Sequence, residues 1–220
     1  GHKVRVVNCL ADIYGAENVV IVNPNNPDGE IIKFNDLLKI ANKEIHENGL
    51  LVIDEAFADA QPETSIIPHL TNDLTIVLRS FGKFFGLPGI RLGFAIGSPY
   101  QINNIKKKLG PWAVSGPALE IGARALNDVR WIEATRTELL VRCKKLDAIL
   151  ERAGLKVLGG TYLFRLIEYE RAQMLFYHLG KLGIYVRQFP EYKNWLRLGV
   201  PNSKSNFARL EEALMAALIS

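Results

Sequence analysis

Short apolar runs alternate with helical patterns through the first half of the chain. Continuous apolar stretches predict four strands, at residues 19–22, 50–54, 74–78 and 92–96. Residues 3–7 also read as a strand, and apolar residues at helical spacing predict a helix over residues 35–48. Strands that are apolar throughout and separated by helices indicate an α/β fold whose sheet is covered on both faces.

The pattern changes after residue 117. Residues 118–153 predict a long helical region that is interrupted at most near residues 127–128. Shorter elements follow, namely strands at residues 155–158, 162–167, 184–187 and 195–200 and helices at residues 170–182 and 206–219. This α+β pattern predicts a small C-terminal domain over residues 126–220, whereas residues 1–125 belong to part of a larger domain.

Composition and charge argue against a membrane or a nucleic acid as a partner. The 220 residues are 48% hydrophobic, which is enough to bury a substantial core. No apolar run approaches the roughly 18 residues of a membrane span, so we expect no membrane partner. The net charge of +4 is small, and the cluster of lysines at residues 106–108 is typical of a solvated helix end, so we expect no nucleic-acid partner.

The cysteines and histidines indicate neither a metal site nor an oxidising compartment. Cys9 and Cys143 lie far apart without metal-ligand spacing, and the four histidines share no spacing with them. Two incidental thiols suit a reducing compartment, so we expect a cytoplasmic protein without a metal. The chain begins without a methionine, from which we expect residues upstream, including the N-terminal portion of the larger domain, to be missing; Gly1 and His2 as a cloning remnant are the alternative.

Four segments place polar residues where a strand gives way to a loop, which is where ligands bind in open α/β sheets. The first, NPNNPDG at residues 23–29, contains the usual turn residues, so it is either a plain turn or a rigid mount for an amide that faces a ligand. The second is Asp54, which closes an apolar run. A buried carboxylate must be paired, either with a helix N-terminus or a basic side chain, or with a protonated heteroaromatic nitrogen.

The third segment is RSFGKFFGLPGIR at residues 79–91. Its Lys83 is flanked by aromatic residues and glycines, which is unusual for an exposed helix face. Desolvation there favours a neutral, nucleophilic amine that can form a Schiff base. Ser80 and Arg91 supply a hydroxyl and a guanidinium suited to a phosphate. A surface loop with unrelated charges is the alternative.

The fourth segment is WLRLGV at residues 195–200, where Arg197 interrupts an apolar strand. A buried arginine requires an anion. That anion belongs either to the protein or to a substrate, and the sequence leaves both alternatives open.

In this order and at this spacing, the four segments resemble the fold-type-I enzymes that depend on pyridoxal 5'-phosphate (PLP), in the branch of histidinol-phosphate aminotransferase. The resemblance covers essentially the whole chain. It implies an aspartate-aminotransferase-like fold, PLP as the cofactor, a small-molecule substrate and a homodimer.

The resemblance also implies roles for individual residues. Asn26 would hydrogen-bond the phenolic oxygen of PLP, and Asp54 would pair with its pyridine nitrogen. Lys83 would form the Schiff base with the cofactor and then act as the proton shuttle. Ser80 and Arg91 would hold the PLP phosphate.

The sequence departs from the aminotransferase pattern at two positions, which restricts the set of enzymes within the branch that it resembles. Phe57 stands three residues after Asp54, where a tyrosine hydroxyl usually contacts the phenolic oxygen, and Gly82 stands where a second hydroxyl often lies.

The segments at residues 54–57, 79–80 and 111–115 look most like the threonine-phosphate decarboxylases of cobalamin biosynthesis. Those enzymes convert L-threonine O-3-phosphate to aminopropanol phosphate and carbon dioxide. This likeness assigns Arg187 and Arg197 to the phosphate or the carboxylate of the substrate.

Three functions therefore stand as hypotheses. The first is a PLP-dependent decarboxylase (a lyase), the second is an aminotransferase of the histidinol-phosphate type, and the third is a non-catalytic protein that keeps the fold. The presence of Asn26, Asp54, Lys83 and Arg91 argues against the third. The resemblance also implies an upstream phosphate-cradling loop and a ring-stacking aromatic residue, and a chain without them can contain the lysine and still be inactive.

Overall fold

A computed structural model describes residues 3–13, 15–41, 49–70 and 73–218. The chain divides into two compact units. The first consists of residues 1–24 and 31–125, and the second of residues 25–30 and 126–220. The short segment 25–30 thus belongs with the second unit, although it lies early in the sequence.

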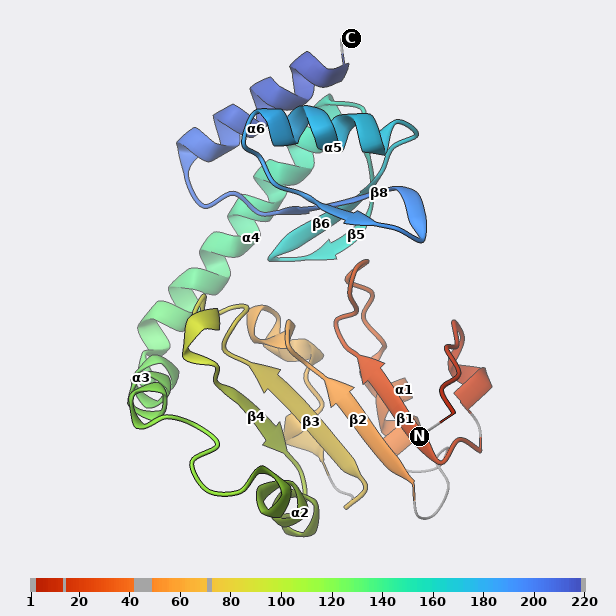
Figure 1. Cartoon of the computed structure of the whole chain (residues 1–220), viewed down its shortest axis with the longest axis vertical. Helices are drawn as coiled ribbons and strands as arrows, with labels where there is room; N and C mark the ends of the chain where they lie inside the picture. Colours follow the sequence, from red (N-terminus) through yellow and green to blue (C-terminus); the bar gives the residue numbers. More distant parts are fainter. Residues whose placement is uncertain (1–2, 14, 42–48, 71–72, 219–220) are drawn as a thin grey trace. The chain divides into compact units, whose positions relative to one another are not determined.

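The first unit is built on a four-stranded sheet, seen as adjacent arrows in Figure 1. The strands are β1 (Asn18–Val22), β2 (Leu50–Asp54), β3 (Thr75–Ser80) and β4 (Gly93–Ile96). They lie in the order β1-β2-β3-β4, with the first three parallel and β4 antiparallel to β3. All four strands were predicted from the apolar runs.

The two faces of this sheet differ in burial. One face carries Val19, Ile21 and Ile53, which are buried in the core of the unit. On the other face Val20 is 72% exposed, because a strand directs successive side chains to opposite sides. Within the described residues, the second face is therefore less covered than the sequence predicted. Both sets of positions are apolar, so the sequence runs read as if both faces were buried.

Two helices of the first unit are α1 (Phe34–Lys39) and α2 (Pro99–Leu109). The first lies within the helix predicted for residues 35–48, of which residues 42–48 are outside the described residues. The second begins where the Ser98 hydroxyl accepts a hydrogen bond from the Gln101 amide and ends at Gly110, whose φ is 71°. Its last turn carries the exposed lysines 106–108, as predicted for a solvated helix end.

The first unit also contains single-turn 3-10 helices. They are Leu10–Ile13, Ala58–Ala60, Pro62–Thr64, Ile67–His69 and Pro88–Ile90. Residues 3–7 form no strand, so that prediction is wrong: Val4 and Val6 are 82% and 88% exposed and pair with no strand among the described residues. An alternating sequence cannot form a strand without a partner edge.

The long helical region divides as predicted into α3 (Gly116–Asn127) and α4 (Val129–Arg152). The break between them has a local cause, because the Asp128 side chain accepts a hydrogen bond from the Trp131 amide at 3.0 Å and so caps α4.

The second unit is an antiparallel sheet covered by helices. Its strands are β5 (Lys156–Thr161), β6 (Phe164–Glu168), β7 (Arg187–Phe189) and β8 (Tyr192–Gly199), in the order β5-β6-β8-β7. Figure 1 shows α5 (Ala172–Lys181) and α6 (Lys204–Leu218) lying over this sheet. Side chains of α4, α5, α6 and the strands share one buried apolar core. Among all described residues, no helix combines the length and the apolar character that a membrane crossing requires.

Candidate active site

Two polar side chains end adjacent parallel strands of the first unit. Asp54 is the last residue of β2 and Ser80 the last of β3, and Asp54 lies in register with Leu78. Leu78 and Ser80 are two residues apart, so Asp54 and Ser80 project from the same face of the sheet. The predicted position of Asp54 at the carboxyl end of a strand is confirmed.

Asp54 is half-buried and has no cationic partner within the described residues. One carboxylate oxygen, Oδ1, accepts a hydrogen bond from the Ala56 amide at 2.9 Å. No described lysine, arginine or histidine nitrogen lies within 4 Å, and the helical turn that follows begins at Phe57 rather than at Asp54. Neither a salt bridge nor a helix cap therefore accounts for its charge.

Lys83 lies in the loop between β3 and β4. Its neighbours Phe81 and Phe84 are buried, and Phe81 stacks on Phe85 with ring centroids 4.3 Å apart. These rings turn inward and leave Lys83 itself exposed, so the prediction of a desolvated lysine is wrong for this chain. The Lys83 Nζ lies 5.5 Å from the centroid of the Phe57 ring, a cation–π contact that joins the loop to the segment after Asp54.

The candidate phosphate ligands flank this loop. The Ser80 hydroxyl accepts a hydrogen bond from the Gly82 amide at 3.3 Å, which tightens the turn before Lys83. Arg91 is exposed, with a left-handed backbone (φ 54°) that is uncommon outside glycine. One of its guanidinium nitrogens, Nη1, donates to the Pro88 carbonyl at 2.9 Å, and none lies within 4 Å of a described carboxylate.

The asparagines of the polar turn at residues 23–29 differ in burial and in hydrogen-bond partners. Asn23 is fully buried; its amide donates to the Thr64 carbonyl at 3.2 Å, and its side-chain oxygen accepts from the Ile32 amide at 2.9 Å. Gly29 closes the turn against β5, where a side chain would meet the backbone of Gly160 at 2.2 Å. Asn26 is exposed, and its Oδ1 accepts a hydrogen bond from Arg197.

Arg197 lies on β8 without a carboxylate among the described residues within 4 Å. Besides Asn26, its guanidinium contacts the Phe164 ring, 4.8 Å from the centroid. Arg187 on β7 is its direct cross-strand partner, and like charges in that position destabilise a sheet. Burial, and then the positive charge of Arg187, lower the pKa of the Arg197 guanidinium. A bound anion would offset both effects, because an opposite charge favours the charged guanidinium.

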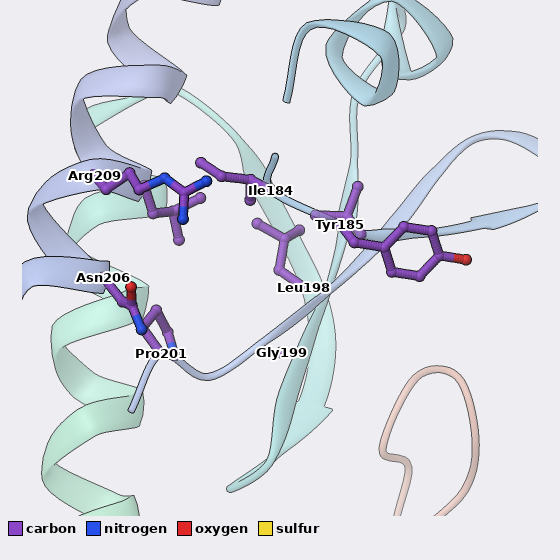
Figure 2. A pocket seen from close by; sticks show the side chains of 9 residues that line it. Ile184, Tyr185, Leu198, Gly199, Pro201, Asn206 and Arg209 are labelled. Carbon is purple, nitrogen blue, oxygen red and sulfur yellow. The ribbon is translucent and has the colours of Figure 1, made fainter. Parts of the chain in front are cut away.

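A separate pocket of about 190 Å³ lies in the second unit, between α6 and the strands (Figure 2). Its lining includes Leu198, which follows Arg197 on β8 and therefore points to the opposite face. The volume is below the roughly 300 Å³ at which small-molecule pockets begin. This pocket contains none of the residues predicted from the sequence.

The predicted residues are thus gathered in two groups. The first unit holds Asp54, Ser80, Lys83 and Arg91, and the second holds Asn26, Arg187 and Arg197. Within the described residues, no cluster of histidine, cysteine, aspartate or glutamate side chains has the geometry of a metal site.

Sequence reasoning missed a buried polar cluster under the ends of β2 and β3. Its charged members are Glu55, Asp59 and Arg79, and Ser65 joins them. The signal in the sequence was present but short: Glu55 extends an apolar strand by a second carboxylate, and Arg79 interrupts the next strand.

The chain combines two units. One is an α/β unit with a carboxylate and a lysine loop at the ends of adjacent strands, and the other is a small antiparallel α+β unit. Residues 5–214 match the family model Aminotransferase class I and II, and the chain belongs to this family. The predicted aspartate-aminotransferase-like fold of type I is confirmed.

Individual relatives sharpen this assignment. The chain is 43% identical over 208 residues to a threonine-phosphate decarboxylase from Sinorhizobium sp., covering 93% of the chain and 62% of that relative. It therefore spans less than two thirds of the length of this curated relative. The histidinol-phosphate aminotransferase of Clostridium acetobutylicum superposes with a TM-score of 0.84 at 26% identity, over 92% of this chain and 64% of that one. The histidinol-phosphate aminotransferase of Sinorhizobium meliloti, solved in complex with pyridoxal-5'-phosphate, superposes with a TM-score of 0.83 at 22% identity, over 93% and 58%.

Proposed function

We propose that this chain carries the lysine and the ring-nitrogen partner of a PLP-dependent enzyme that decarboxylates L-threonine O-3-phosphate to aminopropanol phosphate. One observation supports the proposal most: Asp54 ends β2 without a cationic partner, and Lys83 contacts the segment that follows it through Phe57. The 43% identity to a protein named threonine-phosphate decarboxylase supports this substrate and a place in cobalamin biosynthesis.

The donor set of the first unit fits PLP. PLP presents a protonated ring nitrogen, an aldehyde and a phosphate; Asp54, Lys83 and the pair Ser80 and Arg91 offer a carboxylate, an amine and phosphate ligands. Within the described residues, Asp54, Lys83 and Arg91 form no ion pair. In the second unit the Oδ1 of Asn26 accepts a hydrogen bond from Arg197, and its amide nitrogen would be the atom that donates to the phenolic oxygen.

When bound, PLP supplies a sink for the electron pair left on the substrate Cα after the bond to the carboxylate breaks and carbon dioxide departs. Asp54 keeps the proton on the ring nitrogen through its negative charge. The Lys83 amine would hold the cofactor and would deliver a proton to the substrate Cα. Arg187 and Arg197 orient the substrate by binding its phosphate or carboxylate.

The alternative is an aminotransferase of the histidinol-phosphate type, which the structural similarity to the Clostridium acetobutylicum enzyme favours. Phe57 favours the decarboxylase, because its ring supplies no hydroxyl to the cofactor and contacts Lys83 instead. We further propose that residues 1–125 form part of the PLP-binding large domain and residues 126–220 the small domain. A cytoplasmic homodimer completes the proposal, in keeping with the two free cysteines.

The test uses the natural full-length protein with PLP. Incubation with L-threonine O-3-phosphate should release carbon dioxide and form aminopropanol phosphate in equal amounts. Conversion of 2-oxoglutarate to glutamate, without carbon dioxide release, would instead establish the aminotransferase. Neither reaction, together with no covalent PLP adduct, would leave only the non-catalytic hypothesis.

A further inference from the structure

Beneath the ends of β2 and β3, on the side opposite Asp54 and Ser80, lies a compact polar cluster. The Arg79 guanidinium donates through Nη1 to Asp59 Oδ1 at 2.7 Å and through Nη2 to the Ser65 hydroxyl at 2.9 Å. The same Nη2 lies 3.1 Å from Glu55 Oε2. Ser65 in turn donates to Glu55 Oε2 at 2.7 Å, and the Ile66 amide donates to Glu55 Oε1 at 2.8 Å.

This cluster is buried, so its charges depend on one another. The side chains of Glu55 and Arg79 are 0% and 16% exposed, and that of Asp59 is 20% exposed. Burial raises the pKa of the Glu55 carboxyl, against the lowering effects of Ser65, the Ile66 amide and Arg79. Removing one partner of such a pair leaves the other charge uncompensated in a low dielectric.

The cluster is joined by covalent bonds to the candidate active site. Glu55 follows Asp54 directly, and Arg79 precedes Ser80 directly. The Glu55 amide also donates to the Leu78 carbonyl at 2.9 Å, so the ladder between the two strands continues one residue past Asp54. Because successive residues of a strand point to opposite sides, an ion pair on one side fixes where the neighbouring side chains lie on the other.

We infer that Glu55 and Arg79 form a positioning pair, which clamps the carboxyl ends of β2 and β3 and so holds Asp54 and the Lys83 loop in working alignment. This inference rests on the proposed function. Neither residue touches the reacting atoms; both act through the residue next to them in the chain. Ser65 and Asp59 complete the clamp by holding the two ends of the Arg79 guanidinium.

The sharpest variant is Glu55→Gln. Its Oε1 can still accept from the Ile66 amide, and its amide nitrogen can donate to the Ser65 hydroxyl, but that nitrogen meets Arg79 as a second donor. The substitution therefore breaks one contact of the cluster and keeps its shape. Glu120→Gln is the matched control, since Glu120 pairs with Arg124 on the exposed surface of the same unit at 2.8 Å.

The experiment measures the full-length holoenzyme, with the absorbance of the lysine-bound cofactor titrated against pH and with kcat and KM for L-threonine O-3-phosphate. Glu55→Gln should shift the absorbance titration and lower kcat by about tenfold to a hundredfold, the cost of a small misalignment, with KM changed less than threefold. Arg79→Lys keeps the positive charge but loses the two-pronged guanidinium, so it should retain only part of the wild-type activity. Glu120→Gln should match the wild type in both measurements.

A folded Glu55→Gln enzyme with the wild-type titration and kcat would overturn the inference and leave the cluster a support of the fold alone. If Glu55→Gln does not fold, Ser65→Ala gives the answer, because it removes one hydrogen bond each from Glu55 and Arg79 and keeps both charges; an unchanged titration and kcat in that variant would equally overturn the inference. Failure of the proposed function is a separate result, since the wild-type protein would then release no carbon dioxide from L-threonine O-3-phosphate.

Discussion

Arg79 and Arg91 belong to one stretch of chain, yet they lie in contrasting regions. Around Arg79, beneath the ends of β2 and β3, a guanidinium is matched by two carboxylates and a hydroxyl, and the fold supplies every counter-charge. Asp54, on the other side of the sheet, and Lys83 and Arg91, in the loop after β3, have no ion-pair partner among the described residues. We call these regions the paired side and the open side. We interpret the difference as a separation between charges that hold the strands together and, under the proposed function, charges that are available to a ligand.

The second unit repeats the contrast on neighbouring strands. Arg165 on β6 is bound by both carboxylate oxygens of Asp147, at 2.5 and 2.9 Å. Arg197 on β8 has an amide oxygen and an aromatic ring, and it faces a second arginine across the ladder. The charge of Arg165 is neutralised within the protein, whereas an added anion would reduce the repulsion between Arg197 and Arg187.

On the open side, Asp54→Ala should have the largest effect on the reaction. Turnover of the full-length enzyme should fall by roughly two to three orders of magnitude, because the charge that holds the proton on the ring nitrogen is lost. PLP should still bind through Lys83. Steady-state kinetics and cofactor absorbance measure the two properties. Asp36→Ala, an exposed aspartate of α1 paired with Lys39, is the control and should change neither.

On the paired side, Arg79→Ala should act on stability. We expect the free energy of unfolding to fall by about 3–5 kcal/mol, because Glu55 is left buried without its cation. Urea denaturation checks the value. Arg124→Ala removes an exposed arginine from an ion pair and should cost no more than about 1 kcal/mol. Equal losses in the two variants would show that the Arg79 cluster stabilises the fold no more than an exposed ion pair does.

Substitutions of Arg197 test whether this arginine of the second unit binds the substrate. A desolvated guanidinium contact to an anion is worth roughly 1.5–3 kcal/mol, so Arg197→Ala should lower kcat/KM for L-threonine O-3-phosphate about tenfold to a hundredfold. Arg197→Lys keeps the charge without the fork and should recover only part of the loss. Arg152→Lys, at an exposed pair with Glu211, is the control. If the wild-type enzyme processes unphosphorylated threonine equally well, these arginines do not recognise phosphate.

The smallest effect concerns pH. Burial raises the pKa of Glu55 above its ordinary value of 4.5, so the folded state binds a proton that the unfolded state has released. The stability that this proton contributes is present below pH 4.5 and is lost as the pH rises through the folded pKa. Thermal unfolding of wild type and Glu55→Gln should therefore diverge as the pH rises from that value. Curves that run parallel at every pH would show that Glu55 titrates as it does in the unfolded chain.

The sequence predicted the elements that carry the open side, because their signals are local. Asp54 interrupts an apolar run, and a carboxylate there marks the end of β2. The paired side was not predicted, because Asp59 and Ser65 reach Arg79 only through turns whose path no periodicity reveals. The burial of Lys83 was predicted wrongly, since flanking aromatics were read as its surroundings when they pack away from it. The roles of the site residues stay predictions.

The most direct test of the open side is to find which lysine holds the cofactor. The full-length protein is incubated with PLP, reduced with borohydride, digested and analysed by mass spectrometry. We expect a single modified peptide that carries the adduct on Lys83, and no adduct in Lys83→Ala. An adduct on another lysine in an enzyme that releases carbon dioxide from L-threonine O-3-phosphate would contradict the assignment.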